Sequence, residues 1–514
     1  MSERTPSPST GELVAVPNGA AIPLADLPQL DLDSFREAIT GARARGRRVS
    51  ALFAAPAGGG IALYVVLADD DTGLVECAST ALSGDRFPSM TPTCPEVHLF
   101  EREIAEQWGV LPAGHPWLKP VRFHPSYRPS HDAWGRPPGA APVVGVTDFF
   151  RVEGEEIHEV AVGPVHAGVI EPGHFRFQCH GEHVFHLEIS LGYQHRGVER
   201  SMVGGPDKRS IHTMETLAGD TTIGHATAYC QILEALGGRH ATPRGCALRG
   251  VALELERLAN HTGDLGALAG DVGFLPTASY CGRLRGDFLN MTAVLCGSRF
   301  GRGLVRPGGT AFDVDQARVA DLQRRLDSAE RDVTSAARLL WTTPTVMARF
   351  EETGRVSADT AAALGMVGPA ARASGLRRDV RKTHPTGIFQ MVHIPLSISE
   401  SGDVFARAYV RWLEIERSID YVRSQLGQLP RRDARRDSGP PRASMFAVSM
   451  VEGWRGEVCH VALTDDRGRF SHYKVVDPSF HNWSGLAMAL RDQQISDFPL
   501  CNKSFNLSYC GHDL

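Results

Sequence analysis

Three titratable side chains near the middle of the chain have the chemistry that proton transfer requires. Asp220 and His225 fall within the polar, glycine-containing stretch GDTTIGHA, and Glu199 precedes them in HRGVER. A carboxylate whose pKa is raised by burial, or an imidazole, can pass a proton near neutral pH. A polar cavity among them could hold water and relay protons. The alternatives are that these side chains only satisfy one another's hydrogen bonds, or that Glu199 forms a structural ion pair with Arg196 or Arg200.

A group of histidines in HGEHVFH raises the question of a metal site. His180, His183 and His186 are close in sequence, with His174 and His195 nearby. This spacing would suit one face of a helix, but the histidines fall around a predicted hairpin turn, where such spacing alternates faces. We therefore interpret them as surface or hairpin histidines.

The cysteines do not form a metal-binding or disulfide pattern. None of the ten is spaced as CxxC from another, the arrangement typical of zinc ribbons and iron–sulfur ligation. Each is interpreted as a small, buried apolar side chain. The chain also lacks a glycine-rich dinucleotide or phosphate-loop fingerprint, so NAD binding is not predicted.

The composition is that of a soluble protein with more than one domain. A chain of 514 residues is too long for a single compact core, and its 42% hydrophobic and 22% charged residues are ordinary values. The formal net charge of −5 gives no reason to expect a nucleic-acid partner. Apolar runs are too short to span a bilayer and the N-terminus is polar, so we expect a cytoplasmic chain that reaches a membrane only by docking onto other subunits.

The elements that must position these residues begin with a small α+β domain, expected over residues 31–130. Residues 1–30 are rich in Pro, Ser and Gly and are expected to be disordered or only lightly attached. The stretch DLDSFREAITGARARG predicts a capped helix, VSALFAAPAGGGIALYVVLADDD predicts two strands joined by a glycine turn, and EVHLFEREIAEQWGV predicts a second helix. A linker rich in Pro, Gly and aromatic residues is expected over residues 131–155.

The second unit, expected over residues 156–514, begins with a hairpin that turns at Gly181–Glu182 and continues mostly as helices over residues 202–426. MFAVSMVEGWRGEVCHVALTDDRGRFSHYKVVD predicts another hairpin, turning at DDRG, and the tail predicts a helix followed by an extended end. The predicted fold class is therefore α+β and multidomain: a small α+β N-terminal domain followed by a mainly helical bundle framed by small β-hairpins.

Several motifs together carry a resemblance to a known family. FEREIAEQWGVLPAGHP resembles the signature of the small hydrophilic core subunit of complex I. LGYQHRGVER resembles the start of that complex's quinone-site core subunit, which shares ancestry with the large subunit of nickel–iron hydrogenases. The fusion of both resembles the large subunit of formate-hydrogenlyase-type, membrane-bound, energy-converting hydrogenases. GPVHAGVIEPGHFRF, ALELERLANH, VGPAARASGLRRDVRKTHP and NWSGLAMALRDQQISDFPL follow in the family's order, so the resemblance covers residues 95–514.

The chain departs from this family at the metal site. The metal-bearing relatives hold nickel and iron with two CxxC motifs, because hydroxyl and methyl groups bind a soft, redox-active metal poorly. Alignment on His225 with the nearby TAY, and on NWSGLAMALR, places these ligand positions at Ala218, Thr221, Ser508 and Gly511. Cys510 lies nearby but out of register. The resemblance therefore predicts a chain without a nickel–iron centre, ending at Leu514 with no extension for maturation to cleave.

The resemblance also implies roles for individual residues. Glu199 stands at the position of the family's proton-transfer glutamate, and His166 fits the GPxH loop of the complex I quinone site. The tyrosine that accompanies this histidine in the family falls close to Gly219, so the phenol donor is missing at that position. Quinone remains a possible ligand.

These observations lead to one leading hypothesis and two alternatives. The leading hypothesis is a peripheral core subunit on the inner face of the cell membrane. It would pack against a small iron–sulfur subunit and sit on a quinone-channel-like membrane subunit, near antiporter-like membrane subunits. Without a cofactor of its own, it would couple the partner's iron–sulfur cluster to an unknown acceptor or to proton movement. The alternatives are a structural module that only bridges such subunits, and a quinone-reducing subunit of the NADH dehydrogenase type.

Overall fold

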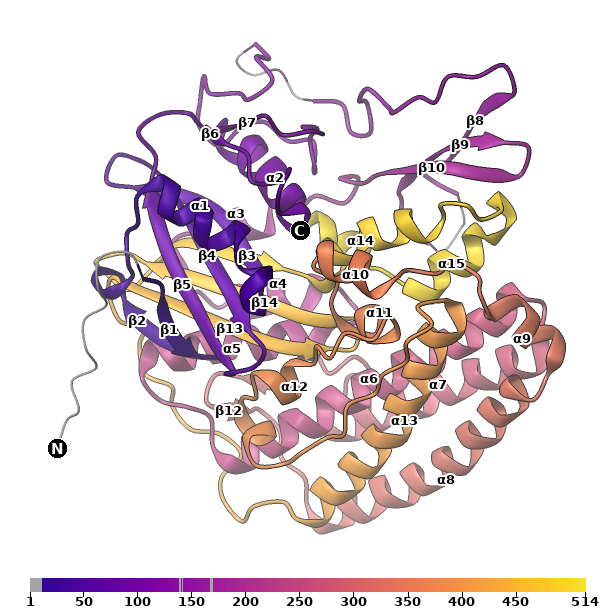
Figure 1. Ribbon diagram of the computed structural model, residues 1–514. Helices are drawn as coiled ribbons and strands as arrows, with labels where there is room; N and C mark the ends of the chain where they lie inside the picture. The colour runs from indigo at the N-terminus through magenta and orange to yellow at the C-terminus, as the bar shows by residue number, and fades with distance from the viewer. Residues whose placement is uncertain (1–11, 138–139, 141, 167–169) are drawn as a thin grey trace.

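Two four-stranded antiparallel sheets, a three-stranded sheet and a bundle of long helices organise the chain (Figure 1). The computed structural model describes residues 12–137, 140, 142–166 and 170–514. The architecture is multidomain α+β, as the sequence predicts. The domain boundaries at residues 30, 130 and 155 stay predictions.

The N-terminal sheet has the strand order β1-β5-β4-β3. Its strands are β1 (Val14–Pro17), β5 (Leu74–Ala81), β4 (Gly60–Asp69) and β3 (Arg47–Ala57). The predicted hairpin is β3 and β4, and the predicted helices are α1 (Leu32–Thr40) and α2 (His98–Trp108). Helix α1 begins where the Asp31 carboxylate accepts a hydrogen bond from the Ser34 N–H at 2.9 Å, an N-cap that satisfies an otherwise unpaired donor. Short elements complete this region: η1 (Leu24–Asp26), η2 (Arg43–Arg45), η3 (Pro95–Val97), β6 (Arg86–Pro88) and β7 (Leu111–Ala113).

The segment before α1 is ordered, and the expected disorder over residues 1–30 is wrong for residues 12–30. Strand β1 pairs with β5, and β2 (Ala21–Pro23) pairs with β13 (Met445–Gly453) near the other end of the sequence. Between them, the Asn18 amide donates to the carbonyls of His384 and Met450 at 2.8 and 2.9 Å. Residues 1–11 lie outside the described residues. The Pro- and Ser-rich composition was misleading because the hydrogen-bond partners of this segment come from distant strands.

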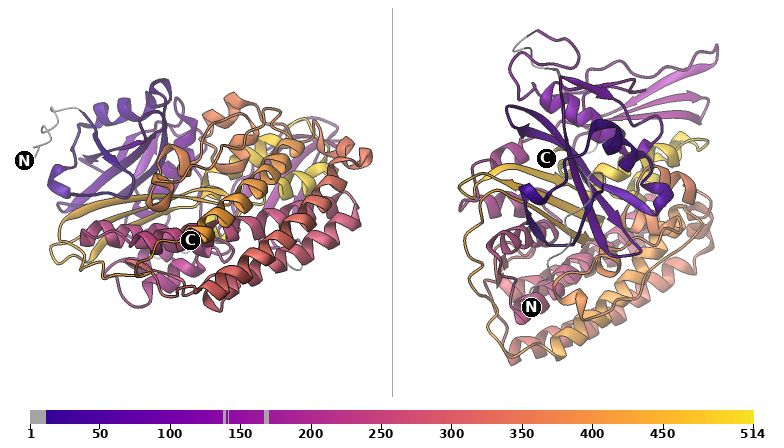
Figure 2. Two further views of the ribbon diagram at one scale, coloured as in Figure 1. Left: turned by 90° about the horizontal axis from the view of Figure 1, so that it is seen from below. Right: turned by 60° about the vertical axis from the view of Figure 1, so that its left-hand side comes forward.

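The C-terminal sheet is buried on both faces. Its strands β13, β14 (Gly456–Thr464) and β15 (Phe470–Val476) form a meander. The predicted turn at DDRG joins β14 to β15, and a second turn, at Trp454–Arg455, joins β13 to β14. Figure 2 shows the N-terminal sheet lying over it, and α5 (Thr222–Gly237) contacts the strands as well. Side chains alternate between two hydrophobic cores: Phe446, Val448 and Met450 join the N-terminal core, whereas Met445, Ala447 and Val451 join the helical core.

A three-stranded sheet contains the other predicted hairpin. Strands β9 (His174–His180) and β10 (His183–Ser190) pair around the expected turn, and β8 (Ile157–Val162) adds a third strand. The described part of residues 131–155, which precedes it, contains no helix or strand.

Helices fill the rest of the chain, with α6 (Pro243–Asp271) at their centre, where it packs against α5, α7 and α13. Besides α5 and α6, the helices that follow the three-stranded sheet and precede the C-terminal sheet along the chain are α3 (Val198–Met202), α4 (Ser210–Thr216), α7 (Leu275–Cys296), α8 (Gln316–Trp341), α9 (Pro344–Phe350), α10 (Ala358–Ala363), α11 (Gly368–Ala373), α12 (Val380–Thr383) and α13 (Val404–Gly427). Small elements between them are β11 (Val305–Arg306), β12 (Gly309–Thr310) and η4 (Gly387–Gln390). The tail continues as α14 (Pro478–Ala489), η5 (Ile495–Asp497), α15 (Phe498–Phe505) and α16 (Tyr509–Asp513), so the expected extended end is wrong.

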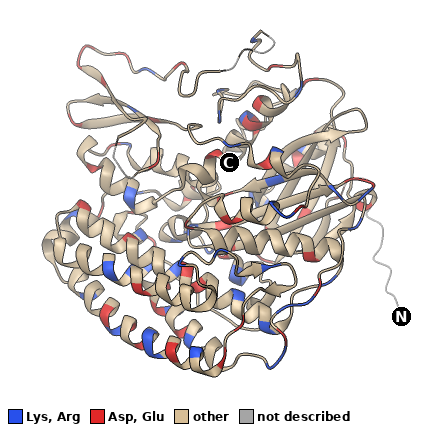
Figure 3. Cartoon of the chain, turned by 180° about the vertical axis from the view of Figure 1, so that it is seen from behind, with Lys and Arg blue, Asp and Glu red and all other residues tan. Residues whose placement is uncertain are grey.

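Charged residues of both signs are interspersed along the long helices of the bundle (Figure 3). Helix α8 shows this pattern on its exposed side, with its apolar residues turned inward. Within the described ranges, none of the helices is long and apolar enough to cross a membrane.

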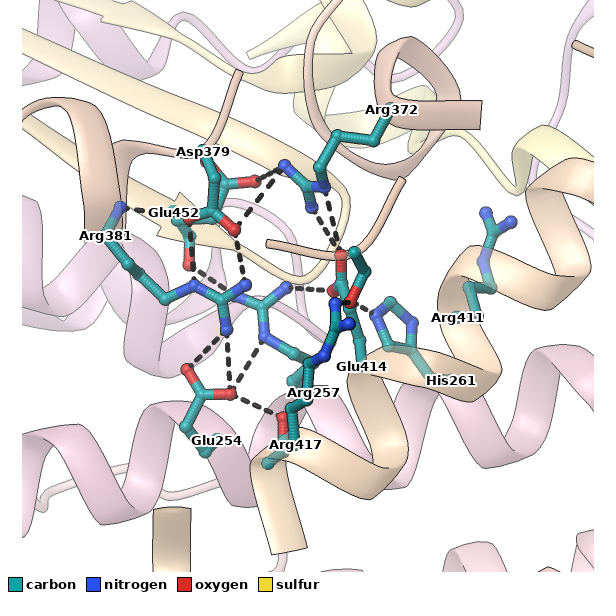
Figure 4. Close-up of polar contacts among 12 residues, drawn as sticks. Glu254, Arg257, His261, Arg372, Asp379, Arg381, Arg411, Glu414, Arg417 and Glu452 are labelled. Carbon is teal, nitrogen blue, oxygen red and sulfur yellow. Dashed lines mark hydrogen bonds and ion pairs between the residues drawn. The ribbon is translucent and has the colours of Figure 1, made fainter. Parts of the chain in front are cut away.

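A network of buried charges joins α6, α11, α12, α13 and β13 (Figure 4). Its members are Glu254, Arg257, His261, Arg372, Asp379, Arg381, Glu414 and Glu452. Glu414 connects three of them: it accepts from Arg257 at 2.9 Å, from Arg372 at 2.7 Å and from His261 at 2.9 Å. Burial opposes ionisation of Glu414, but the charges of Arg372 and Arg257 outweigh it and hold the pKa of this carboxyl well below its ordinary value.

Glu414→Gln is expected to lower the free energy of unfolding by about 3–5 kcal/mol, because it leaves Arg257 and Arg372 without their shared counter-charge. The pKa of Glu414 is lowered in the folded chain, so its contribution is fully present above the unfolded pKa near 4.5 and is lost as the pH falls toward the folded value. Denaturant unfolding of both proteins from pH 7 to pH 3 should therefore show their difference shrinking in acid.

The matched control is Asp287→Asn, which removes an exposed ion pair with Arg283 at 2.8 Å. This change should cost less than about 1 kcal/mol. A similar loss in the two variants would contradict the role of Glu414 in holding the buried network together.

Candidate functional site

The segment around residues 218–221 and the segment around residues 508–511 meet in the folded chain. The Arg455 guanidinium, in the β13–β14 turn, donates to both carboxylate oxygens of Asp220 at 2.6 and 2.7 Å and to the Asn506 carbonyl at 2.5 Å. A cavity of about 340 Å³ adjoins them, and its lining includes Gly219, Asp220, Ser508 and Cys510. The structure thus brings together the two stretches that sequence alignment assigned to one site.

The side chains at the four aligned positions carry no soft donor atom. Ala218 offers a methyl group, Thr221 and Ser508 offer hydroxyls, and Gly511 has no side chain. The Ser508 hydroxyl instead accepts from the Gly511 N–H at 2.9 Å as the N-cap of α16. Nearby, burial raises the pKa of the Cys510 thiol to about 12, which keeps it protonated. These groups do not fit a nickel–iron centre. In the described part of the chain, no three His, Cys, Asp or Glu side chains are grouped so that they could hold a metal ion.

The Asp477 carboxylate occupies the space next to Gly511. A Cβ atom placed on Gly511 would lie 2.6 Å from Cγ of Asp477, well inside van der Waals contact. The carboxylate cannot easily move away, because Oδ1 accepts from the Ser479 N–H at 2.8 Å and Oδ2 is hydrogen-bonded to His225 at 3.1 Å. A cysteine at position 511 is therefore sterically incompatible with Asp477 as it stands here.

From Asp477, a hydrogen-bonded chain of side chains runs inward between α5 and the C-terminal sheet. His225 Nε2 is 3.1 Å from Asp477 Oδ2, its Nδ1 is 3.0 Å from His460 Nε2, and His460 Nδ1 is 2.8 Å from the Tyr473 hydroxyl. The two histidines are fully buried. Beyond Tyr473 lies Tyr229, with a distance of 6.2 Å between the ring centroids.

The direction of each bond follows from the protonation states. Burial opposes ionisation of Asp477, but its hydrogen bond to His225 and the nearby charges lower its pKa, so the carboxylate is an acceptor. His225 Nε2–H then donates to Asp477, and in the tautomer with its only proton on Nε2, His225 accepts at Nδ1 from His460 Nε2–H. Burial lowers the pKa of His460 and raises the pKa of Tyr473, which keeps His460 neutral and leaves the Tyr473 hydroxyl to donate to its Nδ1. Every member of the chain donates toward Asp477.

Asp220 does not belong to this chain, although Arg455 acts on both acids. Burial alone would raise the pKa of Asp220, but the charge and hydrogen bonds of Arg455 outweigh it and lower the pKa. Close by, Glu256 accepts from the N–H groups of Ile223 and Gly224 at 2.7 and 3.2 Å, at the start of α5. Burial raises the pKa of Glu256 to about 8, against the effect of these hydrogen bonds. Two acids of opposite pKa shift, Asp220 before α5 and Glu256 on α6, thus lie beside the start of α5.

Glu199 is not part of this hydrogen-bonded chain. It lies at the edge of the C-terminal sheet, on the side opposite the chain. Its carboxylate is 2.9 Å from Lys474 Nζ and accepts from Gln107 and from the Val475 N–H at 3.0 Å each. The expected ion pair with Arg196 or Arg200 is therefore wrong in its partner: Arg196 donates to backbone carbonyls, and Arg200 stacks over an aromatic ring. Burial opposes the shift, but Lys474 and Arg122 lower the pKa of Glu199 to about 2. This is the reverse of the raised pKa on which a relay through Glu199 relied.

His166 is separate from both groups. Burial lowers the pKa of His166, and its ring lies 6.5 Å from the ring of Tyr509, measured between centroids. The family resemblance placed the tyrosine that accompanies this histidine close to Gly219, where the phenol is missing. In the folded chain, Tyr509 lies near His166 and supplies a phenol there. The hairpin histidines do not converge either, since His180 pairs with Glu156 and His183 with Asp492.

The residues that complete the site were missed because they come from the region interpreted only as a hairpin. Arg455, His460, Tyr473 and Asp477 lie in or next to β13–β15. One signal was available: His460 is a titratable residue within GEVCHVALT, a strand buried at every position. A polar side chain in such a strand needs a partner, because an unpaired buried polar group is costly.

Comparison with known proteins agrees with this architecture. Residues 271–447 match the family described as the respiratory-chain NADH dehydrogenase 49 Kd subunit. The chain is 30% identical over 350 residues to the carbon monoxide-induced hydrogenase of Rhodospirillum rubrum, which covers 68% of this chain and 97% of the relative. It is 28% identical over 441 residues to formate hydrogenlyase subunit 5 of Escherichia coli (82% and 76% covered). It is also 28% identical over 370 residues to NADH-quinone oxidoreductase subunit 4 of Thermus thermophilus (66% and 90% covered).

These matches define the class as subunits related to hydrogenases and NADH-quinone oxidoreductases. Within that class, the chain belongs to the family of the respiratory-chain NADH dehydrogenase 49 Kd subunit and the related hydrogenase subunits, as the motifs in its sequence indicated.

Gly511→Ala is expected to lower the free energy of unfolding by about 1–3 kcal/mol, because the added methyl group meets the Asp477 carboxylate. In an Asp477→Ala background the same change should cost less, since the obstructing carboxylate is gone. A double-mutant cycle by denaturant unfolding measures this coupling. Gly219→Ala is the control, because a Cβ there has no neighbour within 4 Å. Equal costs of Gly511→Ala in both backgrounds would refute the steric relation.

Proposed function

We propose that the chain is a peripheral core subunit of a membrane-bound, complex I-like oxidoreductase, that it works without a nickel–iron centre, and that it moves protons. The observation that carries this proposal is the hydrogen-bonded chain from Asp477 through His225 and His460 to Tyr473. It starts beside the aligned metal positions and passes through the buried interior. Family membership supports the assembly into a larger complex, because relatives carry names such as formate hydrogenlyase subunit 5 and NADH-quinone oxidoreductase subunit 4.

Proton transfer along the chain needs only short movements. In one concerted shift, a proton reaches the Tyr473 oxygen and the Tyr473 hydroxyl proton moves to His460 Nδ1. The His460 Nε2 proton moves to His225 Nδ1, and the His225 Nε2 proton moves to Asp477. Asp477 then releases its proton toward the cavity lined by Asp220 and Ser508. The guanidinium of Arg455 favours the ionised form of Asp477, which resets the acceptor. The shift leaves each imidazole in its other tautomer, so both histidines must return to the first tautomer before the next proton passes.

The proposed partners follow the family resemblance. A small iron–sulfur subunit would hold the cluster that supplies electrons, and a quinone-channel-like subunit with antiporter-like subunits would form the membrane part. The chain would lie on the inner face of the cell membrane. Glu199, ionised and paired with Lys474, is assigned a structural role in this proposal.

Two alternatives carry their own observations. A purely structural module agrees with the fully paired buried acids but gives no reason for a continuous chain of titratable groups. A quinone site is favoured by the proximity of His166 and Tyr509. The proton-transfer proposal is preferred because each of its links lies within hydrogen-bonding distance.

Nickel analysis tests the first part of the proposal. The purified complex is expected to contain far less than one nickel per chain and to show no hydrogen uptake or evolution, because hydroxyl and methyl groups cannot replace thiolates as ligands. Inductively coupled plasma mass spectrometry of the intact complex measures the metal. Stoichiometric nickel would refute this part.

Asp477→Asn tests the proton pathway. The amide keeps the size of the side chain but cannot take up and release a proton, so proton translocation should fall by about two orders of magnitude. The measurement is acidification of inverted membrane vesicles, with a reduced viologen dye as electron donor, normalised to the amount of assembled complex. Asp492→Asn, at an exposed acid, is the control and should keep full activity. Full activity of assembled Asp477→Asn would favour the structural module.

A further inference from the structure

A second cavity lies between the N-terminal domain and the C-terminal helices, away from the site described above. It has a volume of about 260 Å³ and is lined by α2, the loop of residues 115–123, β10 and α14. Its walls are mostly apolar and include Leu99, Trp117, Leu187 and Met488. Junctions between domains are frequent places for small-ligand sites, and the volume is near the lower end of the range for such sites.

One of the polar groups of this mostly apolar cavity is a buried cation, Arg102. The side chain of Arg102 is only 8% exposed, and its Nε and Nη2 donate to the carbonyls of Lys119 and Pro120 at 2.8 and 2.9 Å. Its guanidinium lies 4.8 Å from the ring centre of Trp117. Among the described residues, Arg102 forms no ion pair with a carboxylate within 4.0 Å, and Nη1 donates no hydrogen bond. The charges of Glu106 and Glu188 favour the ionised guanidinium through space, but neither carboxylate contacts it.

The other polar groups of the cavity do not supply that charge. Lys119 and Glu188 are paired with each other at 2.6 Å. His98 is bonded to Ser484 at 2.9 Å, and burial lowers the pKa of His98 to about 3, so this imidazole is neutral. His115 is likewise neutral, since burial lowers its pKa to about 4. Burial also lowers the pKa of Arg102 to about 10, which still leaves it charged at neutral pH. Arg491 also lines the cavity but is exposed, so within the described residues Arg102 is the buried cation of this cavity that no carboxylate contacts within 4.0 Å.

We propose that this cavity binds a small amphiphilic monocarboxylate, whose carboxylate accepts from Arg102 Nη1 and whose apolar body lies along Leu187 and Met488. One buried guanidinium with no carboxylate in contact matches one negative charge. A phosphate dianion would bring a second charge into an apolar space that already holds Glu188, at a high desolvation cost. The volume limits the body to about ten carbon atoms.

Decanoate is the probe, with decanol as the uncharged ligand of equal length. Isothermal titration calorimetry of the full-length protein, below the micelle concentration and at pH 8, should show one decanoate per chain. Decanoate should bind at least about ten-fold more tightly than decanol, because a hydrogen bond to a charged group adds to the same apolar burial. Octanoate, which is two methylenes shorter, should bind about sixteen-fold more weakly than decanoate, since each lost methylene removes about four-fold in affinity.

Two variants locate the site. Arg102→Met should reduce decanoate affinity to that of decanol while leaving decanol binding unchanged, and the unchanged decanol binding shows that the cavity is intact. Ala487→Phe, on α14, should fill the cavity and abolish binding of both ligands. Four results would each overturn the proposal. The first two concern the unchanged protein: no binding of decanoate, or equal binding of decanoate and decanol. The other two are a preference for decanoate that survives Arg102→Met and binding that survives Ala487→Phe. Binding of decyl phosphate more tightly than decanoate would overturn the choice of a monocarboxylate.

Discussion

The buried charges around α6 are the constraint on which the rest of the molecule depends. Removing several arginines and acids from water costs several kcal/mol for each ion, and the cost is offset only when every partner stands in place. The partners belong to helices and a strand that are far apart in sequence: Arg257 on α6, Arg372 on α11, Glu414 on α13 and Glu452 on β13. The network therefore fixes these elements relative to one another more strictly than apolar contacts would.

This constraint extends to the candidate site. Arg257 also donates to the backbone carbonyl of Glu452 at 2.8 Å, immediately before the turn that carries Arg455. Arg455 in turn holds Asp220 through two hydrogen bonds. A guanidinium thus supplies the positive charge between the two stretches that the family resemblance assigns to a metal. Asp477 fills the space beside Gly511. Its hydrogen bond to His225 links the region of the aligned metal positions to the buried interior.

The C-terminal sheet makes this arrangement possible because both of its faces are covered. One face receives the apolar side chains of the N-terminal domain, and the other meets α5 and the helical core. Water is excluded from both sides, so His460 and Tyr473 can satisfy their polar atoms only by bonding to each other and to His225. The same burial that forms the core thereby lines up the titratable groups in a single chain.

The sequence by itself determined the family, the α+β class, most helices and the hairpins, because apolar periodicity and capping residues act over short distances. It also showed which side chains occupy the aligned metal positions. It did not reveal the order of residues 12–30, whose strands pair with distant partners. Nor did it reveal the partner of Glu199, which is Lys474.

The hydrogen-bonded chain from Asp477 to Tyr473 was decided by the tertiary structure alone. Of its members, only His225 was singled out from the sequence, and its partner Asp477 lies 252 positions away. The pKa shifts of Glu199, Glu256 and Asp477 depend on burial and on charges supplied by other elements, which local sequence patterns do not encode. Sequence patterns record the conformation of each segment, whereas hydrogen-bonding distances between segments arise only when the chain packs.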